Sequence, residues 1–142
     1  MPIQIRSLND ADPPILSAAF DGIGWGKPVA QYQRYLAEEA AGMRTCLVAT
    51  VEGQFAGYVT VNWAPTYPGF VDPKIPEIQD LNVLPAFRRR GIATRLLDRS
   101  EAEVARRSGV VGIGVGLHPR YNGAQAVLDD HLVLHLTKRL GR

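Results

Sequence analysis

The stretch "VLPAFRRRGIATRLL", residues 83–97, joins a strand-like run to a helix-like run through three arginines and a glycine. The start of a helix carries unpaired N–H groups and the positive end of the helix dipole, so cations are unfavourable there. The missing side chain of Gly91 would let an anion approach the converging N–H groups, and guanidinium groups donate fork-shaped hydrogen bonds to phosphate oxygens. The stretch therefore predicts a phosphate-binding loop, and the alternative is a solvated arginine patch beside a turn glycine.

The runs on either side of this stretch follow a mixed pattern. Hairpin-linked strands come first and a strand–helix–strand unit follows, which is typical of a mixed sheet in the α/β or α+β class. The four prolines of 63–76 predict no regular structure there. The expected strands are 3–6, 45–51, 54–62, 77–83, 110–117 and 132–137, and the expected helices are 15–20, 29–41, one between Gly91 and Gly109, and a short one before the last strand.

The composition is that of one globular domain spanning residues 1–142. The chain is 46% hydrophobic and 21% charged, and no run approaches the roughly 20 apolar residues of a membrane span. The net charge of +2 is too small to indicate a nucleic-acid or membrane partner. A single cysteine, Cys46, excludes an internal disulfide and is expected to be a buried thiol. The N-terminus lacks a signal-peptide pattern, so we expect a cytoplasmic protein.

Arg88-x-x-Gly91-x-Ala93 resembles the acyl-CoA pyrophosphate signature of the GNAT superfamily of N-acyltransferases, Gln/Arg-x-x-Gly-x-Gly/Ala. The apolar strand before it, the amphipathic helix after it and the order of elements up to about residue 125 are similar to that family as well. The resemblance implies a mixed, mainly antiparallel sheet flanked by helices, with a splayed cofactor cleft between strands 77–83 and 110–117. It also implies acetyl-CoA as co-substrate, no metal and an amine acceptor, and it allows a homodimer.

The resemblance assigns roles to the residues of the loop. Backbone N–H groups from Arg89 to Ala93, with Thr94 and the arginine side chains, would hold the pyrophosphate. The edge of strand 81–83 would pair with the pantetheine arm, and a backbone N–H near Val83 or Leu84 would polarise the thioester carbonyl. The expected cofactor-binding residues are Leu81, Val83, Leu84, Arg88, Arg89, Arg90, Gly91, Ile92, Ala93, Thr94 and Asn122.

Acyl transfer to an amine needs the neutral amine, so a carboxylate near the thioester is expected to accept a proton. Glu77 is the first candidate, because it precedes Arg88 by eleven residues, the offset of the general base in histone-acetylating members of the family. The alternative is that Glu77 is a strand-end carboxylate facing water. Asp80 is the second candidate, on the opposite strand face unless a bulge changes the alternation.

The C-terminal part departs from the family pattern. "YNGAQ" at 121–125 is present, but the position of the usual general-acid tyrosine holds Leu128, so Tyr121 is the substitute candidate. A helix-and-strand segment expected after Gln125 is absent, so the domain is shortened or interrupted from about residue 126.

Two further groups of residues have open interpretations. Glycines 112, 114 and 116 share one strand face and predict a close backbone approach, which would suit the cofactor cleft. The loop aromatics either line an acceptor pocket or anchor their loops to the core. These aromatics are Trp25, Trp63, Tyr67 and Phe70.

The resulting prediction is an N-acetyltransferase in which a primary amine attacks acetyl-CoA directly in a ternary complex. The acceptor is a small amine, an amino-acid or antibiotic amino group, or a protein lysine or N-terminus. One alternative is a catalytically idle CoA-binding regulatory module of the same fold, since the tyrosine is missing. A less favoured one is a nucleic-acid-binding domain that uses Arg88–Arg90, Arg95 and Arg99.

Overall fold

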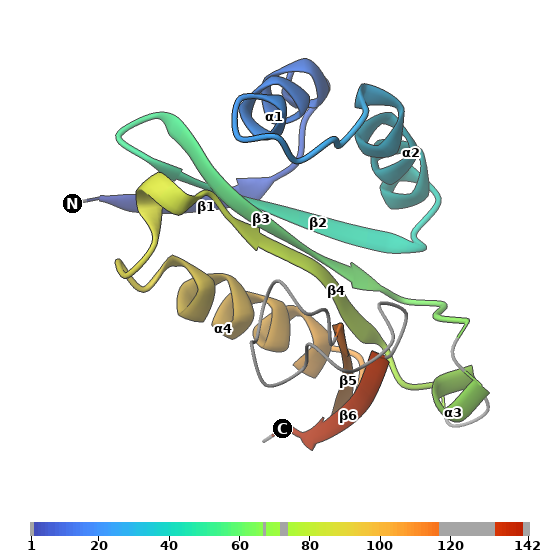
Figure 1. Cartoon of the computed structure of the whole chain (residues 1–142). Coiled ribbons are helices and arrows are strands. Elements are labelled where there is room, and N and C mark those ends of the chain that lie inside the picture. The colour runs from blue at the N-terminus through green and yellow to red at the C-terminus, as the bar shows by residue number, and fades with distance from the viewer. Residues whose placement is uncertain (1, 67, 72–73, 117–132, 141–142) are drawn as a thin grey trace, which may run out of the picture.

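A single mixed sheet with helices on both faces organises the molecule (Figure 1). The computed structural model describes residues 2–66, 68–71, 74–116 and 133–140. The strands are β1 (Ile3–Ser7), β2 (Arg44–Val51), β3 (Gln54–Asn62), β4 (Glu77–Val83), β5 (Val110–Gly116) and β6 (Val133–Arg139). The helices are α1 (Asp12–Asp21), α2 (Val29–Ala40), α3 (Pro68–Val71) and α4 (Ile92–Ala105), with a 3-10 turn at Pro85–Phe87.

The strands of the described part of the chain lie side by side in chain order, from β1 to β6. Every neighbouring pair is antiparallel except β4 and β5, which are parallel because α4 crosses over between them. Glu52 and Gly53 both have positive φ, as the tight turn of the predicted β2–β3 hairpin requires. The mixed, mainly antiparallel sheet is thus confirmed, whereas the short helix expected before the last strand lies outside the described residues.

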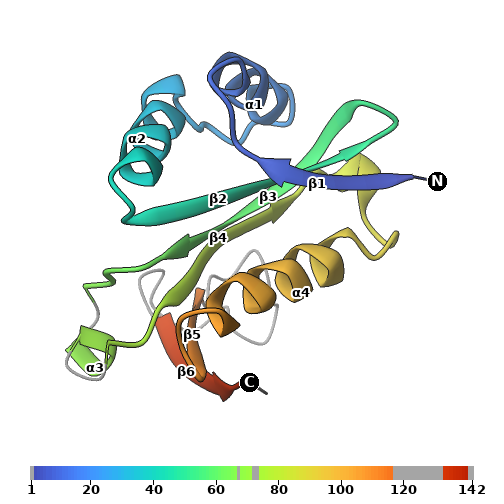
Figure 2. The same ribbon diagram turned by 180° about the vertical axis from the view of Figure 1, so that it is seen from behind.

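Each face of the sheet is covered by a different part of the chain. Figures 1 and 2 show α1 and α2 on one face and α4 on the other. The core under α1 and α2 is rich in aromatic rings and contains Cys46, whose thiol is buried as expected. The core under α4 is aliphatic. Adjacent residues of β2 and β3 enter opposite cores, so these strands are apolar along most of their length.

The prediction of no regular structure over 63–76 is wrong at α3. A proline is tolerated in the first turn of a helix because its missing N–H has no intrahelical partner there. Phe70, 3% exposed, fixes this helix by packing its ring directly against Gly112. A Cβ at Gly112 would lie 2.4 Å from that ring, so the close approach predicted for this glycine is made by Phe70.

β4 and β5 separate soon after they meet. They pair only at Glu77–Gly112 and Ile78–Ile113, and beyond Ile78 the β5 side of β4 is without a strand partner in the described part of the chain. β3, by contrast, follows β4 up to Val83. The predicted splay between these two strands is therefore confirmed, and it leaves one edge of β4 open.

β4 also contains an irregularity that redirects its side chains. The register with β3 shifts between Tyr58 and Thr60, where β4 has one residue more than β3. Asp80 lies in this bulge with φ of 57°, a conformation that a non-glycine residue rarely adopts. The alternation of side chains along β4 is therefore broken at Asp80.

Every helix in the described ranges is too short or too polar to span a bilayer.

The close approach of β3 and β4 at Gly57 yields a stability prediction. An added Cβ would lie 2.5 Å from the carbonyl oxygen of Asn82 and 3.1 Å from the Cα of Val83, both backbone atoms. Gly57→Ala should therefore push the strands apart and lower the free energy of unfolding by about 1–3 kcal/mol. Urea denaturation measures this, and Gly26→Ala, whose added Cβ meets nothing within 4 Å, is the control. Equal midpoints for the two variants would contradict the close packing.

Candidate functional site

The loop between β4 and α4 presents an uncapped helix start. Gly91 is the N-cap residue and has φ of 78°, the left-handed conformation that favours glycine. No side chain in the described structure caps α4, and the Arg95 N–H makes a helical bond to the Gly91 carbonyl at 3.0 Å. The N–H groups of the first turn, Ile92–Thr94, have no acceptor within the helix. They are available to an external acceptor, as the sequence predicted for an anion site.

Buried apolar residues hold this helix start while the arginines stay outside. Ile92 and Leu96 are 1% and 0% exposed and pack into the aliphatic core. Arg88, Arg89 and Arg90 are exposed. Because the Ile92 side chain is in the core, only the backbone of that residue can contact a ligand.

Two adjoining hollows form a groove from the open edge of β4 to the start of α4. The larger has a volume of about 410 Å³ and is lined by Trp25, Leu81, Asn82, Val83, Arg88 and Ala93. The smaller has a volume of about 200 Å³ and is lined by Val83, Phe87, Arg88, Arg89, Gly91, Ile92, Ala93 and Thr94. Val83, Arg88 and Ala93 belong to both, which is why we treat the two hollows as one groove.

Most of the expected cofactor-binding residues line this groove, and the exceptions can be named. Leu84 is buried in the core beneath α1 and α2, and the Arg90 guanidinium lies 5.4 Å from the Phe87 ring centroid; neither is among the lining residues. Asn122 and Tyr121 lie outside the described residues.

The backbone of Val83 faces the open edge of β4. The Leu84 N–H donates to the Ala56 carbonyl oxygen at 2.8 Å, on the β3 side. Successive N–H groups of a strand point to opposite edges, so the N–H and C=O of Val83 point away from β3, toward the groove. Of the two N–H groups considered for the thioester carbonyl, that of Leu84 is already bonded and that of Val83 is directed at the opening.

An aromatic ring holds the Arg88 side chain beside the groove. The Arg88 guanidinium lies 5.7 Å from the centroid of the Trp25 ring, which itself stacks on Phe20 at 5.9 Å. Such cation–π contacts favour one arrangement of a long, otherwise mobile side chain. Arg88 is thereby held at the point where the two hollows meet.

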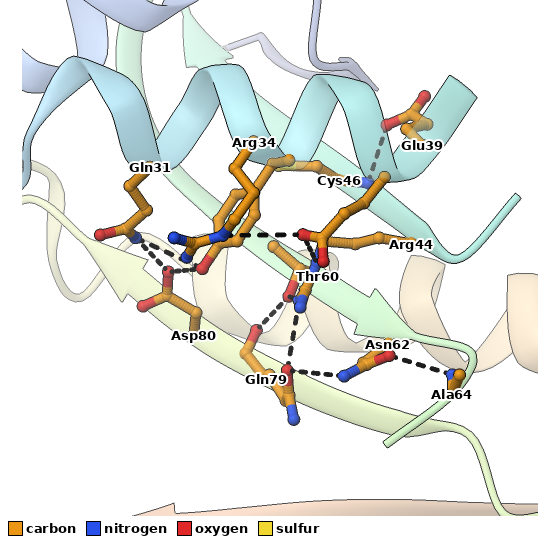
Figure 3. A network of polar contacts seen from close by, with 12 residues as sticks. Gln31, Arg34, Glu39, Arg44, Cys46, Thr60, Asn62, Ala64, Gln79 and Asp80 are labelled. Carbon is orange, nitrogen blue, oxygen red and sulfur yellow. Dashed lines mark hydrogen bonds and ion pairs between the residues drawn. The ribbon is translucent and has the colours of Figure 1, made fainter. Parts of the chain in front are cut away.

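The Asp80 carboxylate accepts several hydrogen bonds beneath α2, and Figure 3 shows the one from Gln31 beside the neighbouring contacts of Gln79 and Arg44. The bulge turns Asp80 toward that helix, and its side chain is 22% exposed. Its donors come from β3, β4, α2 and the loop before α2. They are Tyr58 Oη (2.6 Å), Tyr35 Oη (2.8 Å), Asn82 Nδ2 (2.8 Å), Gln31 Nε2 (3.1 Å) and Lys27 Nζ (3.4 Å).

The two tyrosine hydroxyls remain donors at neutral pH. Burial, and then the negative charge of Asp80, raises the pKa of Tyr58 and the pKa of Tyr35 well above the usual range. Burial likewise raises the pKa of Tyr32, whose hydroxyl donates to that of Tyr58 at 3.3 Å. Asp80 is therefore bonded by neutral hydroxyls that stay protonated.

Glu77 is buried, at 4% exposure, and does not face water. Gln79 Nε2 donates to Glu77 Oε1 at 2.9 Å, and Gln79 Oε1 accepts from Arg44 Nη1 at 3.2 Å. Arg44 in turn lies over the Tyr35 ring at 4.5 Å. Gln79 and Asp80 are consecutive, yet the side chains of both lie on the α2 side of the sheet. A bulge was expected to change the alternation of side chains along the strand in this way.

The loop aromatics divide between the two roles considered for them. Trp25 lines the groove. Trp63 anchors its loop, because its Nε1–H donates to Thr45 Oγ1 at 2.9 Å, and Phe70 is buried against Gly112. Tyr67 lies outside the described residues.

Sequence reasoning did not identify Asn82 and Phe87 as groove residues, or Tyr35 and Tyr58 as partners of Asp80. A signal existed for one of them, because Asn82 follows Asp80 by two residues. The register of β3 with β4, which brings Tyr58 opposite Asn82, is set by the tertiary structure. No sequence signal connects Tyr35 to Asp80, since that contact depends on the bulge and on how α2 packs.

Comparison with known proteins agrees with this geometry. The Acetyltransferase (GNAT) family matches residues 5–128, and comparison with curated protein sequences gives no match. The structure of yncA from Salmonella typhimurium with its cofactor acetyl-CoA has a TM-score of 0.71 and 17% identity, covering 98% of this chain and 94% of that one.

Two further solved structures share the fold. A ribosomal-protein-alanine N-acetyltransferase from Brucella melitensis has a TM-score of 0.70 at 21% identity, covering 96% of this chain and 99% of that chain. A GNAT acetyltransferase from Streptococcus pneumoniae has a TM-score of 0.69 at 15% identity, covering 99% and 100%. Since the family match spans most of the sequence and the fold agrees with it, the chain belongs to the GNAT acetyltransferase family.

Proposed function

We propose that this protein transfers an acetyl group from acetyl-CoA to a primary amine, which attacks the thioester directly in a ternary complex. The observation that carries the proposal is the groove, which links the open edge of β4 at 81–83 to the uncapped start of α4. Family membership supports acetyl-CoA as the donor, and a structure of the same fold, yncA, contains acetyl-CoA.

The helix start and its arginines would hold the diphosphate of the cofactor. The N–H groups of Ile92–Thr94 and the side chains of Arg88 and Arg89 border the smaller hollow. A diphosphate there offsets both the positive end of the α4 dipole and the repulsion among the arginines. Arg90, which does not line the groove, would contribute positive charge at longer range.

The open edge of β4 would bind the pantetheine arm. Leu81 and Val83 line the larger hollow, and an extended amide-bearing chain can pair with a free strand edge as a further strand would. We assign the Val83 N–H to the thioester oxygen, because it points to the opening and the Leu84 N–H does not. A donor at that position stabilises the negative charge that develops on the oxygen during attack.

We place Asp80 ahead of Glu77 as the proton acceptor, reversing the order expected from the sequence. Asp80 is more exposed than Glu77, and its Oδ1 accepts from Asn82, which lines the groove. The carboxylate would take a proton from the amine, directly or through a water, while the nitrogen forms its bond to the carbonyl carbon. The carbon–sulfur bond then breaks, and a thiol of pKa about 8.5 leaves without an obligatory protein acid.

Arg88→Ala tests the cofactor site. Loss of a guanidinium that contacts phosphate should weaken acetyl-CoA binding by about tenfold or more, since a charge-assisted hydrogen bond contributes about 1.5–3 kcal/mol. Isothermal titration calorimetry with acetyl-CoA measures this. Arg99→Ala is the control, because Arg99 lies on α4, pairs with Glu103 and is not a groove residue. Equal dissociation constants for the two variants would refute the proposed site.

Asp80→Asn and Glu77→Gln test the proton acceptor. We expect Asp80→Asn to lower kcat by about 10²–10⁴, the contribution of a general base, while acetyl-CoA still binds. Thiol release from acetyl-CoA is followed with a panel of polyamines, amino acids, aminoglycosides and alanine-terminated peptides, with the exposed Asp98→Asn as control. A loss of activity confined to Glu77→Gln would instead identify Glu77 as the proton acceptor. Thiol release that no amine stimulates, despite tight binding, would identify an idle CoA-binding module.

A further inference from the structure

Lys27 carries a primary amine of the protein itself to Asp80, the proposed proton acceptor. It lies in the loop between α1 and α2, its Nζ is 3.4 Å from Asp80 Oδ1, and its side chain is 20% exposed. The chain has two other lysines, Lys74 and Lys138, and both are exposed. The least exposed of the three lysines is thus the one beside the proposed proton acceptor.

Contacts along its length keep Lys27 in this position. Ser17 Oγ donates to the Lys27 carbonyl oxygen at 2.6 Å, which fixes the backbone. The Nζ lies 5.5 Å from the centroid of the Phe20 ring, and Trp25, two residues earlier, stacks on the same ring and lines the groove. The lysine and the groove wall therefore share one aromatic support.

Asp80 does not depend on this lysine. Its two oxygens accept hydrogen bonds of 2.6–3.1 Å from the neutral groups of Tyr58, Tyr35, Asn82 and Gln31. The Lys27 contact, at 3.4 Å, is the longest of the five. The Lys27 amine is therefore held loosely and can leave the carboxylate at little cost.

The same oxygen joins the amine to the groove. Asp80 Oδ1 accepts from both Lys27 Nζ and Asn82 Nδ2, and Asn82 lines the larger hollow. The Lys27 amine is thus separated from the groove wall by a single carboxylate oxygen. An acceptor amine can lose its proton to Asp80 only if its nitrogen lies within hydrogen-bond distance of the carboxylate, as the Lys27 Nζ does.

We propose that Lys27 is a self-acetylation site of this protein, an inference that rests on the proposed function. Asp80 accepts a proton from the Lys27 ammonium and passes it to solvent. The neutral nitrogen attacks the thioester carbonyl carbon of acetyl-CoA and gives up its second proton to Asp80, as the N–C amide bond forms and the C–S bond breaks. Coenzyme A leaves as a thiolate that takes up a proton from solvent, with no change of oxidation state. The product amide is uncharged and no longer pairs with Asp80.

The experiment incubates the full-length protein with acetyl-CoA alone and maps acetylation by mass spectrometry after cleavage at acidic residues. Acetylation guided by the groove should modify Lys27 about tenfold or more faster than Lys74 and Lys138, because proximity replaces a bimolecular encounter. Uncatalysed acetylation would instead follow exposure and modify Lys74 and Lys138 first. The rate at Lys27 should be independent of protein concentration, as a reaction within one molecule requires.

Variants separate guided acetylation from its alternatives. Arg88→Ala should slow the labelling of Lys27 at subsaturating acetyl-CoA, and Asp80→Asn should suppress it. Because Arg88 is exposed, we expect Arg88→Ala to fold, so this variant still tests the proposal if Asp80→Asn does not fold. Lys138→Arg is the matched control and should leave labelling of Lys27 unchanged. Labelling of Lys27 no faster than that of Lys74, or a rate that rises with protein concentration, would overturn the inference.

Calorimetry and thiol release with added amines, run in parallel, distinguish the two possible failures. If acetyl-CoA binds and amines consume it while Lys27 stays unmodified, self-acetylation is wrong and the proposed function stands. If acetyl-CoA does not bind, both are wrong.

Discussion

The parting of β5 from β4 after Ile78 is the constraint on which the rest of this structure depends. β4 is paired with β3 up to Val83, so its N–H and C=O groups on one side are satisfied. On the other side the pairing with β5 ends after two residues, and the N–H and C=O of Val83 face an opening. A strand edge inside a sheet is normally covered, and one left open is a binding surface for an extended chain. The groove at 81–94 continues from this edge.

The bulge at Asp80 connects that edge to the opposite layer. By adding one residue to β4, it brings the side chains of both Gln79 and Asp80 to the α2 side, although they are consecutive. The groove and the polar network beneath α2 therefore meet at neighbouring residues of one strand. Asn82 belongs to both, since it lines the groove and donates to Asp80. A reaction that brings an acyl donor to one side of β4 and an acceptor amine to the other is compatible with this arrangement.

The elements that follow from local pattern were predictable, and the contacts that follow from packing were not. Alternating and helical periodicities identify the strands and long helices, and the run Arg88–Gly91 predicts an anion site through residue chemistry alone. The contacts that the sequence did not reveal join residues distant in sequence. Phe70 orders α3 only because Gly112 leaves room for its ring, and Asp80 reaches Tyr35 only because α2 packs over the bulge. Such contacts have no local signature.

The sequence by itself determined the mixed sheet, the order of its elements and the position of the arginine-rich loop at the start of α4, because periodicity, turn glycines and clustered guanidinium groups act over a few residues. The tertiary structure alone decided that the Val83 N–H is open while that of Leu84 is bonded, and that Asp80 accepts a hydrogen bond from the groove residue Asn82 while Glu77 is buried. It also decided that the Lys27 amine meets Asp80. These outcomes depend on strand register and on one extra residue in β4, which backbone hydrogen bonding across the sheet sets.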